Sequence, residues 1–330
     1  KFLVHDLLPI QLSDCFKDNN LKELHEQWLN MIAGLDGAIC VSKATSDEFE
    51  RWLSEKGITR STTSHISWVH NGADIECAHL SKALPESTKS MLATFQKCLT
   101  ILCVSTLEPR KQQQQILEAV ERLWDTGANI NLVLVGQQGW NVEALAEKIR
   151  HHPEKGKRLF WLDGISDEFL EQIYKASTLL IAASLNEGFG LSLIEGARHE
   201  LPLLVRDIPV FREVAGEHAF YFHGEQAEDL TFALREWLSL FERGEHPLSS
   251  KIRWNTWQKS SEQIKNALIV KNYPRKQLLV DVSELVQRDA KTGIQRVVKN
   301  ILREWLARPP DGYRIEPVYA SIQHGYRYAR

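Results

Sequence analysis

The architecture of this chain can be read outward from residues 178–195, Thr178-Leu-Leu-Ile-Ala-Ala-Ser-Leu-Asn-Glu187-Gly-Phe-Gly-Leu-Ser-Leu-Ile-Glu195. The run from Thr178 to Ser184 is continuous and apolar, which predicts a buried strand. The run from Leu191 to His199 predicts a helix. A strand, a glycine loop and a helix in this order aim backbone N–H groups and a helix N-terminus at an anion, usually a phosphate.

Two carboxylates stand eight positions apart in this stretch. Glu187 is expected on the loop, at the mouth of the sheet. Glu195 is expected about five residues into the helix, roughly 7 Å along its axis at 1.5 Å per residue. Helical side chains lean toward the N-terminus, so Glu195 is predicted to reach a group just beyond the phosphate. The alternative is a tight strand–helix turn with an exposed Glu187 and a solvated Glu195.

The wider region, residues 98–225, alternates apolar runs with amphipathic ones. This pattern predicts a parallel sheet with helices on both faces, an α/β fold of the Rossmann-like kind. In the first helix, an apolar face at helical spacing is predicted to pack on the sheet; it consists of Ile116, Leu117, Val120, Leu123 and Trp124. The strands are expected near 99–105, 130–135, 158–162, 178–184, 201–205 and 219–223, and the helices near 111–125, 141–151, 167–176, 191–199, 209–215 and 227–243.

Two cations follow the first of these strands. Arg110 and Lys111 stand between a strand and a helix, where positive charge is mildly unfavourable, by up to ~1 kcal/mol. An anion bound there would offset that cost, and ligands of such sheets collect beyond the carboxyl ends of the strands. The alternative is a solvated basic turn.

Two further strand ends carry weaker signals. Val135-Gly136 leads through Gly139-Trp140 into a helix and is best explained as turn chemistry. In the segment 162–168, Ser166 is predicted to cap the next helix. Ile165, beside it, is a candidate ligand contact.

The flanking regions repeat the alternation. Strands are expected at 2–4, 37–41 and 65–70, and Ser42 is predicted to cap a helix reaching about residue 56. Trp254, Trp257, Ile264 and Leu268 are expected on one helix. A new cycle then begins, with a strand at 278–282, a helix opened by Thr292-Gly293, and a strand at 315–319.

Composition excludes several classes of protein. The formal net charge of −3 gives no sequence-wide field for nucleic acid. The five cysteines are odd in number and form no Cys-x-x-Cys pair, which favours free thiols over a disulfide framework. The sequence contains neither an apolar run of spanning length nor a signal peptide. Because it starts at Lys1 within a strand-like run, we expect it to be a fragment of a longer chain.

The Glu187–Glu195 pair with its Gly-Phe-Gly resembles the E-x7-E signature of family 4 retaining glycosyltransferases, which have the GT-B fold. The Glu-Pro-Arg-Lys segment ending at Lys111 and the strand-end His5-Asp6-Leu7 resemble other motifs of that family. The Thr-Gly-Ile-Gln-Arg run from Thr292 resembles the bacterial tandem O-antigen mannosyltransferases within it.

This resemblance implies a role for each matched residue. Glu187 would contact the transferred sugar, and His5 would contact it from across the cleft. Arg110 and Lys111 would hold the diphosphate, Glu195 the ribose, and Ile165 would lie beside the base. The loop residues between the two glutamates, which would contact sugar and phosphates, are Gly188, Phe189, Gly190 and Leu191.

It also implies a domain plan. Residues 1–78 would be the C-terminal part of a first acceptor lobe, and residues 79–246 the Rossmann-like donor lobe. Residues 247–272 would be a crossover helix and linker. Residues 273–330 would begin the acceptor lobe of a second glycosyltransferase.

The implied function is transfer of a hexose, with retention of configuration, from a nucleoside diphosphate sugar to a glycan or lipid-linked glycan. Mannose from GDP-mannose, used in cell-surface polysaccharide synthesis, is the expected donor. No cofactor and no metal are expected, because the sequence contains no Asp-x-Asp. The expected location is cytoplasmic, with peripheral membrane association left open. Two alternatives also stay open: a nucleotide-sugar-binding fragment without turnover, and another GT-B enzyme such as a sugar phosphorylase or an epimerase.

Overall fold

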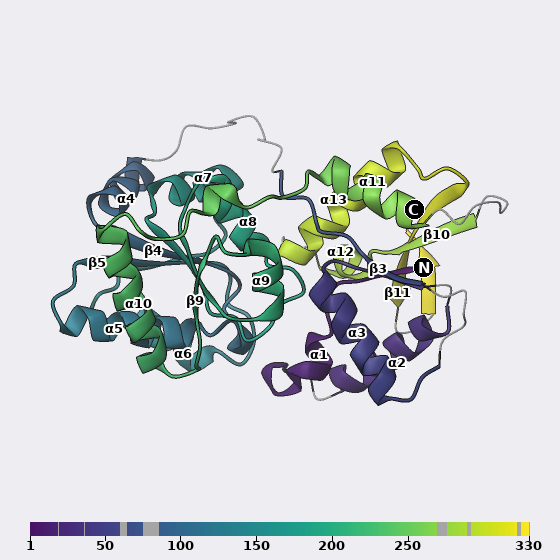
Figure 1. Cartoon of the computed structure of the whole chain (residues 1–330), viewed down its shortest axis with the longest axis horizontal. Coiled ribbons are helices and arrows are strands. Elements are labelled where there is room, and N and C mark those ends of the chain that lie inside the picture. Colours follow the sequence, from purple (N-terminus) through teal and green to yellow (C-terminus); the bar gives the residue numbers. More distant parts are fainter. Residues whose placement is uncertain are drawn as a thin grey trace. The chain divides into compact units, whose positions relative to one another are not determined.

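The computed structural model describes residues 1–18, 20–35, 37–59, 65–74, 86–268, 276–288, 292–321 and 325–329. Contacts divide the chain into two compact units (Figure 1). Unit 1 comprises Lys1–Leu7, Glu23–Asp74 and Trp254–Arg330, and unit 2 comprises Leu8–Lys22 and Ile75–Arg253. Each unit therefore combines segments that lie far apart in the sequence.

Unit 2 is built on a six-stranded sheet in the order β6-β5-β4-β7-β8-β9. Every neighbouring pair is parallel. The chain starts in the middle with β4, steps outward to β6, returns beside β4 as β7, and then steps outward in the other direction. This is the doubly wound order, and its topological switch point lies between β4 and β7. The strands are β4 (Leu99–Val104), β5 (Ile130–Val135), β6 (Leu159–Leu162), β7 (Leu179–Ala182), β8 (Leu203–Arg206) and β9 (Phe220–Phe222).

Helices cover both faces of this sheet, as the sequence pattern predicted (Figure 1). The apolar stripe of α5 is buried on one face, with each member at most 7% exposed, and it joins apolar residues of α6 and α10 in one core. The helices are α4 (Glu86–Lys97), α5 (Gln113–Asp125), α6 (Glu143–Arg150), α7 (Asp167–Ala176), α8 (Leu191–Arg198), α9 (Pro209–Ala215) and α10 (Ala227–Glu242), with short 3-10 turns η2 (Pro109–Lys111) and η3 (Ser249–Lys251). Ser166 caps α7 as predicted, its hydroxyl accepting from the backbone N–H of Phe169 at 3.2 Å.

Two glycines let the loop after β5 approach the loop after β4. A Cβ at Gly136 would lie 2.0 Å from the carbonyl oxygen of Ser105, and a Cβ at Gly139 would lie 2.6 Å from that of Leu107. The backbone N–H of Leu107 donates to Gln137, and that of Gly139 donates back to Leu107, both at 2.9 Å. These glycines therefore serve loop packing.

The N-terminal part of unit 2 contains α1 (Leu8–Gln11) and η1 (Ser13–Cys15). The indole N–H of Trp140 donates to the carbonyl of Cys15 at 2.7 Å, and the Trp140 ring stacks on Phe16 with 5.9 Å between centroids. The amide of Asn186 donates to Gln11 at 2.8 Å. This early segment therefore contacts both the β5 loop and the loop that carries Glu187.

Unit 1 contains two three-stranded sheets, β1-β2-β3 and β10-β11-β12. Its strands are β1 (Phe2–Val4), β2 (Gly37–Cys40), β3 (His65–Trp68), β10 (Lys276–Asp281), β11 (Tyr313–Ser321) and β12 (Gly325–Tyr328), and its helices are α2 (Leu21–Ala33, whose first two residues belong to unit 2), α3 (Lys43–Glu55), α11 (Trp257–Leu268), α12 (Ser283–Gln287) and α13 (Gly293–Ala307). Ser42 caps α3 as predicted, and Thr292 caps α13, the helix that Thr292-Gly293 was expected to open.

One expectation for unit 1 was wrong. Trp254 does not share a helix with Trp257, because α11 begins only at Trp257. The Thr256 hydroxyl accepts from the backbone N–H of Lys259 at 3.1 Å, and the Asp74 carboxylate accepts from that of Trp257 at 2.5 Å. These two acceptors satisfy N–H groups in the first turn of the helix, so α11 begins at Trp257.

Across the ranges that the structure describes, no helix combines the length and apolar character needed to span a membrane.

Candidate functional site

The candidate site of unit 2 lies at the switch point of the sheet. The strands β4 and β7 pair there, and the turns that follow them carry the predicted cations and the predicted loop glutamate. A direct backbone bond joins the two turns: the N–H of Leu185 donates to the carbonyl of Arg110 at 2.8 Å. The fold thus brings Arg110 and Glu187, which are 77 positions apart in the sequence, to the same edge of the sheet. Doubly wound sheets bind their ligands at this edge.

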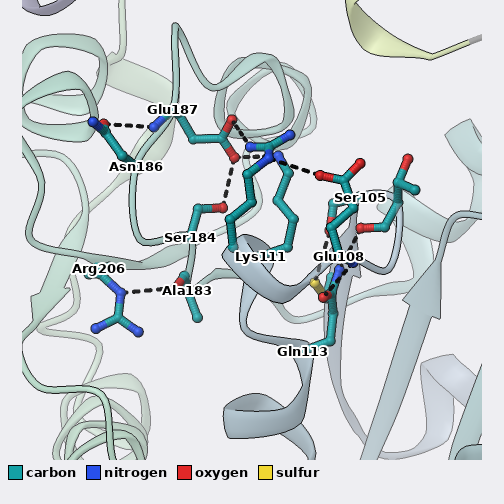
Figure 2. A network of polar contacts seen from close by, with 12 residues as sticks. Ser105, Glu108, Lys111, Gln113, Ala183, Ser184, Asn186, Glu187 and Arg206 are labelled. Atoms are coloured by element: carbon teal, nitrogen blue, oxygen red, sulfur yellow. Dashed lines mark hydrogen bonds and ion pairs between the residues drawn. The ribbon is translucent and has the colours of Figure 1, made fainter. Parts of the chain in front are cut away.

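Glu187 pairs with both predicted cations (Figure 2). Its Oε2 lies 3.2 Å from Nη1 of Arg110, and its Oε1 accepts a short hydrogen bond from Nζ of Lys111. The three side chains are only 12–16% exposed. The alternatives of a solvated basic turn and an exposed Glu187 are therefore both wrong.

A second carboxylate completes this cluster. Oε2 of Glu108 lies 2.8 Å from Nε of Arg110, so the Arg110 guanidinium bridges two acids. We call Glu108, Arg110, Lys111 and Glu187 the ion cluster. It contains two cations and two carboxylates, and it is largely shielded from solvent.

Burial and charge act in opposite directions on the acids of the ion cluster. Burial alone would raise the pKa of Glu187, but the charges of Lys111 and Arg110, with hydrogen bonds from Lys111 and Ser184, lower it to about 2. Burial raises the pKa of Glu108, although Arg110 and Lys111 oppose it. At neutral pH Glu187 is therefore a carboxylate, which can accept hydrogen bonds but has no proton to donate.

The turn around Glu187 is held by its own neighbours (Figure 2). The Ser184 hydroxyl donates to Oε1 of Glu187 at 2.7 Å. The Asn186 side-chain oxygen accepts from the backbone N–H of Glu187 at 2.8 Å. Glu187 is thus fixed at both its backbone and its side chain.

The Gly-Phe-Gly segment leads from this turn into α8. Gly190 has φ +92°, a left-handed conformation that favours glycine, and a Cβ there would lie 2.9 Å from the ring of Phe211. Gly190 is also the N-cap of α8 and provides no side-chain cap. The Phe189 side chain is buried, so its backbone is what it can offer to a ligand.

Glu195 lies within α8 and is 7% exposed, so the solvated alternative is wrong for it as well. Its Oε2 accepts a 2.9 Å hydrogen bond from the hydroxyl of Tyr174, which is itself 1% exposed. Tyr174 comes from α7 and stacks on His199, with 5.2 Å between ring centroids. Glu195 is therefore oriented by a neighbouring helix.

The other two predicted residues are not members of the ion cluster. Ile165 is partly buried on the loop between β6 and α7, and its placement beside a base stays a prediction. His5 belongs to unit 1, where it lines a cavity of about 290 Å³ together with Asp6 and His25. Burial lowers the pKa of His5, with Asp6 opposing the shift. Its role toward the sugar also stays a prediction.

Among the described residues, no group of three or more potential ligands is arranged to hold a metal ion.

Sequence reasoning assigned no role to several residues that shape the site. Glu108 could have been found as the acidic residue next to the two cations in Glu-Pro-Arg-Lys. Ser184 could have been found as the polar residue that ends an apolar run. Arg206 was visible as a charge that ends the run Leu203-Leu204-Val205. Tyr174 gave no signal, because a tyrosine on the apolar face of a helix is ordinary core.

Comparison with known proteins places this domain in a known class. Residues 87–248 match the family described as "Glycosyl transferases group 1". The chain therefore carries a group 1 glycosyltransferase domain, and the resemblance found in its motifs is confirmed.

Two bacterial relatives extend this result. The chain is 43% identical over 276 residues to the serotype-specific mannosyltransferase WbdA of Escherichia coli, in an alignment covering 83% of this chain and 33% of the relative. It is 30% identical over 146 residues to the O-antigen chain mannosyltransferase B of Escherichia coli, covering 42% of this chain and 37% of the relative. The chain thus spans about a third of the length of these relatives.

Two solved structures superpose on this chain and identify its fold. The Anabaena protein Alr3699/HepE, in complex with UDP and glucose, superposes with a TM-score of 0.60 at 18% identity, covering 81% of this chain and 70% of that one. Sucrose-phosphate synthase of Thermosynechococcus elongatus gives a TM-score of 0.62 at 17% identity, covering 81% of this chain and 66% of that one. The GT-B fold expected from the sequence is confirmed.

Proposed function

We propose that this protein is a retaining hexosyltransferase that transfers mannose from GDP-mannose to a hydroxyl of a cell-surface glycan. The observation that carries the proposal is the ion cluster at the switch point of a group 1 glycosyltransferase domain. The similarity to mannosyltransferases over most of this chain supports mannose as the sugar.

The cations of the ion cluster supply the electrostatic part of the mechanism. Departure of a nucleoside diphosphate places negative charge on its phosphate oxygens, and cations that are already oriented stabilise that charge in the transition state. Arg110 and Lys111 are oriented in this way, since Glu108 and Glu187 hold them in place. The N-terminus of α8 adds the positive end of a helix dipole. With these two cations at the diphosphate, we expect transfer to need no metal ion.

Glu187 exchanges partners when the donor binds. Without ligand it is the counter-ion of both cations. An arriving diphosphate competes for the same cations, and the carboxylate is then available to accept hydrogen bonds from sugar hydroxyls. Glu187, a carboxylate in the ligand-free site where its pKa is about 2, orients the sugar by accepting these hydrogen bonds. The proton of the acceptor hydroxyl passes to the leaving diphosphate, on the face from which it departs, and the configuration is retained.

Glu195 and His5 complete the assignment. Glu195, oriented by Tyr174, accepts hydrogen bonds from the ribose hydroxyls of the nucleotide. His5 is a further candidate contact to the sugar. The acceptor is a glycan or a lipid-linked glycan, and a cytoplasmic protein at the inner face of the membrane would meet it there.

A screen of nucleotide sugars tests the proposal. We expect GDP-mannose to raise the melting temperature of the 330-residue chain, and the Arg110→Ala variant to lose most of that increase. Arg122→Ala is the matched control, since Arg122 lies on α5 and pairs with Glu228 at the surface. It should retain the full increase.

A product assay separates turnover from binding. Formation of a mannosylated glycan with the α-anomeric configuration of the donor supports the proposal. Stabilisation by GDP-mannose without product would indicate a binding fragment, and a requirement for inorganic phosphate would indicate a phosphorylase. Equal stabilisation of the parent and Arg110→Ala proteins would contradict the proposed donor site.

A further inference from the structure

Arg206 is a buried cation for which the proposed chemistry has no use. It ends β8 and is 6% exposed. Burial lowers its pKa, and Glu225 and Asp229 oppose the shift. A guanidinium keeps its charge in proteins, so burying one is costly unless its N–H groups are well paired.

The hydrogen bonds of Arg206 spread in three directions, and Figure 2 shows the one to Ala183. Its Nε donates to the carbonyl of Ala183 at 2.9 Å, and its Nη2 donates to the side-chain oxygen of Gln115 at 2.6 Å. Its Nη1 donates to the carbonyl of Gly224. Among the described residues, each hydrogen bond of this guanidinium ends on a neutral oxygen. The group therefore acts as a fixed fork between three segments of the chain, and its Cζ lies over the ring of Phe222, 5.0 Å from the centroid.

Two of these segments carry the ion cluster. Ala183 directly precedes Ser184, whose hydroxyl donates to Glu187. Gln115 is four residues after Lys111, in the first turn of α5. Arg206 thus links the end of the strand before the Glu187 turn with the helix after the Arg110–Lys111 turn. The Leu185–Arg110 backbone bond joins the same two turns at their tips.

Gln115 reinforces this link. Its side-chain N–H₂ donates to the carbonyl of Gln226 at 2.8 Å and to that of Gly224 at 3.3 Å, while its oxygen accepts from Arg206. Arg206 and Gln115 therefore hold the loop after β9 between them.

We propose that Arg206 is a positioning residue that keeps the Glu187 turn in register with the Arg110–Lys111 turn, and so sets the separation of the Glu187 carboxylate from the two cations. Only an arginine can do this, since its planar fork presents donors in three directions at once. Lysine has one small ammonium group on a flexible stem. The kinetic part of the test rests on the proposed function, whereas the structural part does not.

The structural test follows Glu187 by NMR in the ligand-free, full 330-residue chain. With ¹³C-labelled glutamate side chains, the Glu187 carboxyl signal is the one lost in Glu187→Gln. In the parent protein it should remain ionised at pH 4, because its pKa is about 2. In Arg206→Lys and Arg206→Met, we expect its midpoint to rise by about one pH unit as the cations move away. Gln115→Leu removes one acceptor of the fork and should cause a smaller rise in the same direction, which provides a test if the Arg206 variants do not fold.

The kinetic test separates positioning from general destabilisation. In Arg206→Lys we expect kcat for mannosyl transfer to fall about tenfold, with KM for the donor changed by much less. The control is Ile149→Ala, a core truncation on α6, which lowers the melting temperature but should leave the Glu187 midpoint and kcat unchanged.

The possible failures are distinguishable. If the Glu187 midpoint and kcat are the same in Arg206→Lys as in the parent, the positioning role is wrong, even though the parent transfers mannose. It is equally wrong if Ile149→Ala shifts the midpoint as far. If the midpoint rises in Arg206→Lys but the parent transfers no sugar, the positioning role stands and the proposed function fails.

Discussion

The hydroxyl of Tyr174 donates a 2.9 Å hydrogen bond to Oε2 of Glu195, joining α7 to α8 inside unit 2. Both side chains are buried. A hydrogen bond to a charged group contributes about 1.5–3 kcal/mol, more than one to a neutral acceptor. This pair should therefore contribute to folding, in addition to the role in nucleotide binding proposed for Glu195.

Tyr174→Phe should lower the free energy of unfolding by about 1.5–3 kcal/mol, measured by urea denaturation. The control is Tyr221→Phe, which removes a hydroxyl that donates to two neutral carbonyls, those of Gly216 at 2.6 Å and Phe211 at 3.2 Å. That control should cost about 1 kcal/mol. Equal losses in the two variants would contradict the stronger hydrogen bond expected for a charged acceptor at Glu195.

Glu187→Gln should separate binding from turnover. The substitution removes the counter-ion of Arg110 and Lys111, so free GDP no longer competes with a carboxylate for them. We expect the Kd for GDP, measured by calorimetry, to fall by up to about tenfold. Transfer of the sugar should be lost. A weaker affinity for GDP would contradict the exchange of partners proposed for Glu187.

The stability of unit 2 should depend on pH through Glu187. Its folded pKa of about 2 lies below its ordinary value, which is 4.5. It therefore stabilises the fold fully above pH 4.5, and this contribution is lost as the pH falls from 4.5 toward 2. Glu108, with a raised pKa, acts in the opposite direction. Urea denaturation at a series of pH values should show a flatter acid limb in Glu187→Gln than in the parent. Superimposable limbs would be inconsistent with a lowered pKa.

Glu200→Gly should stabilise the protein by about 1 kcal/mol. Glu200 follows α8 with φ +57°, a left-handed conformation that is costly for residues with a Cβ. The control is Gly190→Ala, where φ is +92° and the ring of Phe211 blocks a Cβ, so a loss of stability is expected. Calorimetric melting curves measure the change in melting temperature for both variants. A lower melting temperature for Glu200→Gly than for the parent would refute the argument from backbone strain.

The order of the elements could be predicted from the sequence, because apolar runs such as Leu179–Ala182 have the length and composition of buried strands. The meeting of Arg110 with Glu187 could be anticipated too, since the carboxyl ends of neighbouring parallel strands share one edge. What could not be anticipated is that Glu187 pairs with both cations. Side-chain rotamers and burial decide that, and neither is legible from residue spacing.

Long-range polar contacts could not be predicted from the sequence either. Arg206 bonds Gln115 across 91 positions, and Tyr174 bonds Glu195 across 21 positions on another helix. Such partners are brought together by tertiary packing, which residue spacing does not reveal. Trp254 shows the opposite error: its apolar spacing fitted α11, but the cap at Thr256 set the start of the helix.

Unit 2 takes its first segment, Leu8–Lys22, from the beginning of the sequence and resumes only at Ile75. Trp140 and Asn186 both bond to that early segment. A chimera that exchanged only the contiguous stretch 87–248 between relatives would therefore pair these side chains with a foreign Leu8–Lys22. A chimera intended to change donor specificity should therefore exchange Leu8–Lys22 together with the later stretch. The boundaries of the exchanged segments should follow contacts in the folded protein and not continuity in the sequence.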